Sequence, residues 1–168
     1  MWIPYHGTGT VACSNAGYYG GGKTPVEPYA FWSNAAPSLG LGVDIRLKEI
    51  DYDALRRLVG QWRDVSRFYS GDYYPLTPYS RDNRAWIAWQ FHRPESGEGM
   101  VQAFRRAECS EASVRLKLRG LAALTRYEFA RLDRQETFTA TGEQLAGEGL
   151  AVELGERPGA AVFTYRPE

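Results

Sequence analysis

The stretch Val114-Arg115-Leu116-Lys117-Leu118-Arg119 alternates apolar and basic side chains, and this period of two decides the fold. Successive residues of an extended strand point to opposite faces of a sheet, so the alternation predicts one buried and one solvated face. Similar patterns, separated by Gly- and Pro-containing turns, predict strands at 86–91, 100–105, 126–129, 136–140, 150–154 and 160–165. Short strands with no helical pattern between them are typical of an antiparallel β-sandwich.

A period of three to four marks the segment before these strands, residues 51–69. The apolar positions are Leu55, Leu58, Val59, Trp62, Val65, Phe68 and Tyr69, and they predict one face of an amphipathic helix. Asp51 is expected to accept hydrogen bonds from the free amides of the first turn, and Gly71 to end the helix.

Residues 1–43 are rich in glycine and aromatic side chains. Glycine at this density interrupts regular elements, and we expect only Trp2–Tyr5 and Tyr29–Ser33 to form short strands, with a long loop between them. The sequence therefore predicts two regions. Residues 1–72 form a short α/β part that includes the helix, and residues 73–168 form an all-β domain.

Composition excludes several functions. Lysine plus arginine number 20 and aspartate plus glutamate number 20, so no overall field favours nucleic acid or an anionic membrane as a partner. No apolar run reaches the roughly 18 residues of a membrane span.

The separation of Cys13 and Cys109 matches no zinc spacing, and we expect neither a metal nor a cofactor. The first residues lack a signal-peptide pattern and are more typical of the interior of a larger protein, so the sequence assigns no compartment.

One motif is rejected. Residues 17–24 match the phosphate-binding pattern G-x-x-x-x-G-K-T and include Lys23. That loop needs a helix that begins at the Lys and Thr, whereas Pro25 biases Thr24 away from helical backbone. A flexible glycine loop is the preferred interpretation.

Carbohydrate chemistry leaves a few candidates. Glycoside hydrolysis uses two carboxylates, and Asp44 is a loop aspartate that neither a helix start nor a turn explains. Sugar rings stack on exposed aromatic side chains, and Trp32 is open to two interpretations, ligand stacking or core packing. For His92, at the end of a predicted strand, a structural role is preferred to catalysis.

Several spaced blocks resemble the end of family 36 glycoside hydrolases, the α-galactosidase group. These blocks are residues 71–80, 86–91, 97–106, 118–121 and 141–145, with Tyr127 and Gly149-Leu150. The resemblance implies a β-sandwich that follows a (β/α)8 barrel, with Trp2–Tyr5 and Tyr29–Ser33 as the last barrel strands and 51–69 as the final barrel helix.

The resemblance also implies where substrate contacts belong. Active sites of such barrels lie on the loops after the strands. On that topology the candidate substrate-binding residues are Trp32, Ser33, Asp44 and His6. The catalytic aspartates of the family come from earlier barrel strands that nothing here matches, so no catalytic residue is assigned.

The resulting prediction is the C-terminal part of an α-galactosidase-like retaining glycoside hydrolase, inactive alone, whose sandwich supports the barrel. Its partners would be an α-linked galactoside or other glycoside, bound through the upstream barrel. A chain with so little barrel is expected to expose the apolar face of its helix, and so to need an upstream segment or self-association. The alternative is a non-catalytic β-sandwich that binds carbohydrate or mediates assembly. Charged outward positions such as Arg115 and Lys117 weaken that alternative.

Overall fold

The computed structural model describes residues 7–10, 26–42, 46, 48, 50–134 and 136–168. The chain forms two compact units, Met1–Tyr69 and Ser70–Glu168, which are described separately. The predicted strand Trp2–Tyr5 and the residues His6, Lys23 and Asp44 lie outside the described residues.

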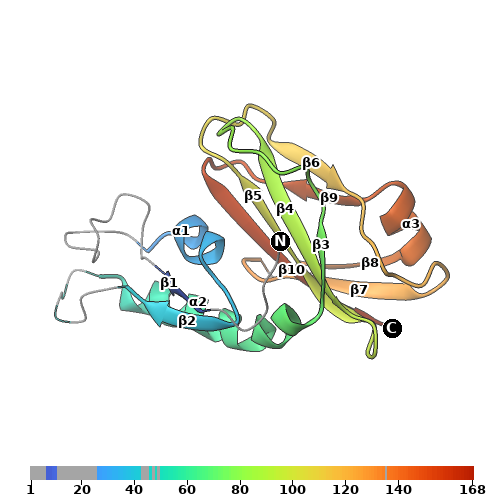
Figure 1. The fold of residues 1–168 in the computed structure, drawn as a ribbon, viewed down its shortest axis with the longest axis horizontal. Helices are drawn as coiled ribbons and strands as arrows, with labels where there is room; N and C mark the ends of the chain where they lie inside the picture. Colours follow the sequence, from blue (N-terminus) through green and yellow to red (C-terminus); the bar gives the residue numbers. More distant parts are fainter. Residues whose placement is uncertain (1–6, 11–25, 43–45, 47, 49, 135) are drawn as a thin grey trace. The chain divides into compact units, whose positions relative to one another are not determined.

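The second unit is built on an antiparallel sheet of six strands in the order β3-β4-β5-β10-β7-β8 (Figure 1). The strand bounds are β3 Asp72–Pro75, β4 Trp86–Arg93, β5 Glu98–Arg105, β7 Arg126–Arg131, β8 Thr137–Thr141 and β10 Gly159–Pro167. All of these except β3 were predicted from the sequence. The mainly β, antiparallel character of this region is confirmed.

A smaller layer covers one face of this sheet. Strands β6 (Ser113–Leu116) and β9 (Leu150–Glu153) pair antiparallel. Their apolar residues, such as Leu116 and Val152, share one hydrophobic core with Phe129 and Phe163 of the large sheet. The alternation is confirmed at Leu116, which is buried while its neighbours Arg115 and Lys117 are exposed. The two layers therefore enclose the core that the period of two predicted.

Helix α3 (Gly142–Gly147) joins β8 to β9 and was not predicted. Thr141 accepts a hydrogen bond from the backbone of Gln144, whose side chain in turn accepts from the Thr141 backbone. This reciprocal cap stabilises the first turn of a helix too short to show a clear period. Leu145 anchors it in the core.

The two tryptophans of β4 lie on opposite faces of the strand. Trp86 lies in the core between the layers, whereas the Trp89 indole donates to Gln102 Oε1 at 2.7 Å on the opposite face. The opposite face is itself covered, because Phe91 and Met100 are both fully buried. Strand β5 is therefore buried at nearly every position rather than at alternate ones.

In the first unit, helix α2 (Tyr52–Val65) continues into a 3-10 turn at Ser66–Ser70, which confirms the predicted helix. Asp51 caps it by accepting from Ala54 N at 2.9 Å, as expected. The expectation that the apolar stripe would be uncovered is wrong in this structure. Leu55, Leu58 and Val65 are no more than 6% exposed. The need for an upstream segment or a second copy stays a prediction.

The predicted strand at Tyr29–Ser33 is wrong, because Pro28–Ser33 form the short helix α1. Pro28 stands at the start of the helix, where its missing N–H costs nothing and its fixed φ is favourable. Among the residues of this unit that the structure describes, the strands are instead β1 (Gly7–Thr10) and β2 (Ser38–Leu41), which pair in parallel.

Candidate functional site

Two of the four predicted substrate-binding residues can be located. Trp32 is 3% exposed, and its ring packs edge-on against Phe31 with centroids 5.4 Å apart. Ser33 is exposed, and its hydroxyl donates to Ala30 O at 3.4 Å. The burial of Trp32 leaves little indole surface for stacking on a sugar. Their role in substrate binding stays a prediction, since His6 and Asp44 lie outside the described residues.

Neither a metal site nor a membrane-spanning helix is found in the part of the chain that the structure describes. There, no cluster of three or more His, Cys, Asp or Glu side chains has the arrangement that a metal ion needs. Among the same residues, no helix is both long and apolar enough to cross a membrane.

A buried polar network lies in the second unit. Gln90, which is fully buried in β4, hydrogen-bonds both the backbone C=O and the backbone N–H of Arg119. Its amide nitrogen donates to Arg119 O at 2.8 Å, and its carbonyl oxygen accepts from Arg119 N at 2.9 Å. The same amide nitrogen donates to the Tyr165 hydroxyl at 2.8 Å. The segment that carries Arg119 is thereby fixed on the large sheet.

His92, two residues further along β4, extends this network. Its Nδ1 lies 3.0 Å from the Tyr165 hydroxyl, and the ring also hydrogen-bonds the backbone of Gly120. Burial lowers the pKa of His92, and the nearby carboxylates of Asp72 and Glu95 only partly offset this. Burial also raises the pKa of the Tyr165 hydroxyl, which accepts from the Gln90 amide and donates to Phe91 O at 3.5 Å.

Gly120 shows why the segment turns directly after Arg119. Its φ of +74° lies in the left-handed region, which other residues enter only with strain. An added Cβ there would also meet His92 and Tyr74 at 3.1–3.2 Å. The turn therefore requires glycine.

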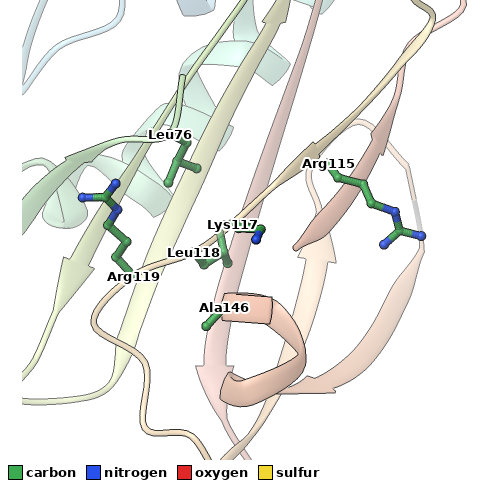
Figure 2. Close-up of a pocket in the computed structure, with 6 residues that line it drawn as sticks. All are labelled: Leu76, Arg115, Lys117, Leu118, Arg119 and Ala146. Carbon is green, nitrogen blue, oxygen red and sulfur yellow. The ribbon is translucent and has the colours of Figure 1, made fainter. Parts of the chain in front are cut away.

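The segment that contains Arg119 borders an open pocket with a volume of about 510 Å³ (Figure 2). Its lining consists of Leu76, Arg115, Lys117, Leu118, Arg119 and Ala146. Arg115 and Arg119 lie on opposite sides of Lys117 and Leu118, and Ala146 of α3 forms another wall (Figure 2). Leu118 is 2% exposed, so the floor is apolar and the rim is basic.

This arrangement was not predicted from the sequence, although one signal was available. Gln90 and His92 continue the core-facing series of Trp86 and Ala88 at a spacing of two. Polar residues at core-facing positions must find hydrogen-bond partners, so such a break in an apolar series marks a buried network. The partner segment at Arg119 could not be found from the sequence.

Comparison with known proteins agrees with the resemblance. Residues 86–164 match the family described as Glycosyl hydrolase family 36 C-terminal domain. No curated protein matches the sequence.

Among solved structures, the GH36 α-galactosidase AgaA from Geobacillus stearothermophilus in complex with stachyose is similar, with a TM-score of 0.67 and 22% identity over 95% of this chain. The α-galactosidase AgaB from the same organism gives 0.58 and 22% over 83%, and the galactosidase domain of the α-galactosidase-sucrose kinase AgaSK gives 0.60 and 20% over 77%. The chain spans only 18–21% of the length of these proteins. At this identity the likeness shows a shared fold. Residues 86–164 therefore resemble the C-terminal domain of glycosyl hydrolase family 36 in sequence, and the fold is shared with these solved structures.

Proposed function

We propose that this chain is the C-terminal part of an α-galactosidase-like retaining glycoside hydrolase, in which the β domain supports a catalytic barrel. The observation that carries the proposal is the family match over residues 86–164, which coincides with the large sheet from β4 to β10.

The first unit supports the barrel part of the proposal. Strands β1 and β2 are parallel and are separated in sequence by helix α1, and α2 follows β2. Parallel neighbours need a crossover connection, usually a helix, and barrels are built by repeating such units. A remnant at the end of a (β/α)8 barrel would have this order of elements.

We assign the hydrolysis of the glycosidic bond to the upstream barrel segment. No segment of this sequence matches the motifs that carry the two catalytic aspartates of the family. An α-linked galactoside or another α-glycoside would bind through the upstream barrel. The domain would act by packing against that barrel and stabilising it.

The test is complementation. The purified chain is assayed for hydrolysis of aryl α-galactoside and aryl α-glucoside, alone and together with the matching upstream segment. We expect activity only after complementation, and the preferred aryl glycoside identifies the sugar.

A matched pair of variants makes this test specific for the β domain. Arg105→Met removes a buried structural guanidinium, whereas Arg84→Met alters an exposed one. Complementation should fail or weaken with the first and persist with the second. Hydrolysis by the chain alone would contradict the proposal and would direct attention to Asp44.

A further inference from the structure

The three basic residues on the rim of the pocket form an isolated positive row. No acidic residue occurs between Glu111 and Glu128, although the chain as a whole has zero net charge. Arg115, Lys117 and Arg119 are all exposed, while Leu116 and Leu118 between them are buried. In an extended chain, residues two apart lie about 6.6 Å from each other on one face. The row therefore spans roughly 13 Å.

Seven other arginines differ from these three cations because each has an acidic partner. Arg56, Arg84, Arg93, Arg126, Arg131, Arg134 and Arg166 each lie within 4 Å of a carboxylate. Within the described part of the chain, the ion pairs include none of the three residues of the row. Arg115 Nη1 makes one weak hydrogen bond, to Gly149 O at 3.4 Å, and Arg119 interacts electrostatically with Tyr74.

The backbone beneath the row is held in place. Gln90 binds Arg119 at both its N–H and its C=O, and Leu118 N donates to Leu145 O at 3.0 Å. A ligand that binds here need not order this backbone, which lowers the entropic cost of binding. Charge, concavity and rigidity thus coincide on one surface.

We propose that this surface, lined by Arg115, Lys117 and Arg119, binds the anionic groups of an acidic carbohydrate chain. The guanidinium groups would hold sulfate or carboxylate oxygens by paired N–H donors, and Lys117 would supply a point charge between them. Leu76 and Ala146, which keep part of their surface exposed, provide apolar contacts for the C–H faces of the sugar. A row of charges fits a chain with repeated anionic groups better than it fits a single ion.

The choice of carbohydrate rests on the proposed function, whereas the anion preference rests on the structure alone. Proteins that bind single-stranded nucleic acid combine positive charge with aromatic side chains on which bases stack. None of the residues that line this surface is aromatic. Nucleic acid is therefore the less suitable polyanion.

The test is binding of the 168-residue chain to dextran sulfate, with unsubstituted dextran as the neutral counterpart, followed by calorimetry or fluorescence anisotropy. The triple variant Arg115→Gln, Lys117→Gln, Arg119→Gln removes the row. The triple variant Arg57→Gln, Arg63→Gln, Arg81→Gln makes the same change in net charge at exposed positions elsewhere. Lys117→Arg retains the charge of the row.

We expect dextran sulfate to bind and plain dextran not to bind. The row variant should lose at least tenfold in affinity, while the control triple and Lys117→Arg stay within about threefold of the parent. Added salt should weaken binding, because exposed charges are screened. Circular dichroism and the urea midpoint verify that each variant is folded.

Equal loss in the two triple variants would overturn the proposal, since net charge rather than the row would then drive binding. Comparable binding of plain dextran would overturn the anionic requirement, and tighter binding of oligo-dT than of dextran sulfate would assign the row to nucleic acid instead. The complementation assay is independent of these measurements, so failure of the proposed function is distinguishable from failure of this site.

Discussion

The side chain of Gln90 and the backbone of Arg119 form a closed pair of hydrogen bonds, 2.8 and 2.9 Å long, between residues 29 positions apart. This arrangement resembles the two hydrogen bonds that a residue exchanges with the residue opposite it on a neighbouring strand. Here the side-chain amide of Gln90 takes the place of the backbone amide of one partner. It fixes the position from which the Arg119 side chain extends.

Replacing Gln90 with leucine should destabilise the β domain by about 2–4 kcal/mol, because Gln90 makes three buried or half-buried hydrogen bonds and the backbone N–H and C=O of Arg119 would lose their partner. Urea unfolding followed by circular dichroism measures the change. Lys117→Gln, an exposed substitution on the same segment, should alter the free energy of unfolding by less than about 0.5 kcal/mol. Similar values for the two variants would mean that the amide pairing contributes little.

Stability should fall as the pH drops through about 6.5, the ordinary pKa of histidine. Burial lowers the pKa of His92 in the folded state, so the unfolded chain binds a proton more readily than the folded one. The stabilisation is fully present above the unfolded pKa and is lost towards the lower folded pKa, with a slope of at most about 1.4 kcal/mol per pH unit.

Urea midpoints between pH 8 and pH 5 check this dependence. His92→Gln should flatten the slope in this window, whereas His6→Gln changes the other histidine and serves as the control. A slope that follows His6 instead of His92 would refute the assignment.

Arg105 should be among the least replaceable residues of the domain. It is 5% exposed, and its guanidinium donates to the carbonyls of Cys109, Ser110, Leu154 and Gly155 at 2.7–3.2 Å. Arg105→Met should cost about 3–5 kcal/mol, because several buried carbonyl groups lose their donor together.

Arg105→Lys should recover only part of this loss, because an ammonium group lacks the planar fork that reaches several carbonyls. Thermal unfolding of both variants, with Arg84→Lys as an exposed control, gives the comparison. Full stability of Arg105→Lys would show that charge alone is sufficient at this position.

Two glycines offer a matched steric test. A Cβ on Gly99 would collide with the carbonyl oxygen of Phe91 and with the Tyr165 ring, whereas one on Gly147 would meet nothing within 4 Å. Gly99→Ala should therefore destabilise the domain by more than about 3 kcal/mol, and Gly147→Ala should be nearly neutral. Soluble yield and urea midpoint measure both, and a stable Gly99→Ala protein would mean that strands β4, β5 and β10 can separate locally.

The sequence predicted those features that depend on local periodicity. Strands β4 to β10 and helix α2 follow from spacings of two and of three to four, since backbone geometry alone decides which side chains share a face. The Asp51 cap is equally local, because donor and acceptor are three residues apart. The family resemblance, stated for blocks from residue 71 onward, also lies in the order of sequence blocks, and the family match covers residues 86–164.

Tertiary structure decided what local spacing cannot encode. The helix at Pro28–Ser33 depends on a buried Phe31–Trp32 pair that outweighs a strand-like composition. The pairing of Gln90 with Arg119 and with Tyr165, the latter 75 positions away, exists only once β4, β10 and the β6 segment are assembled. The three basic residues were visible in the sequence as an outward strand face. Only the packing of Leu76 and α3 beside them made that face concave, because a cavity is a property of neighbours that are distant in the chain.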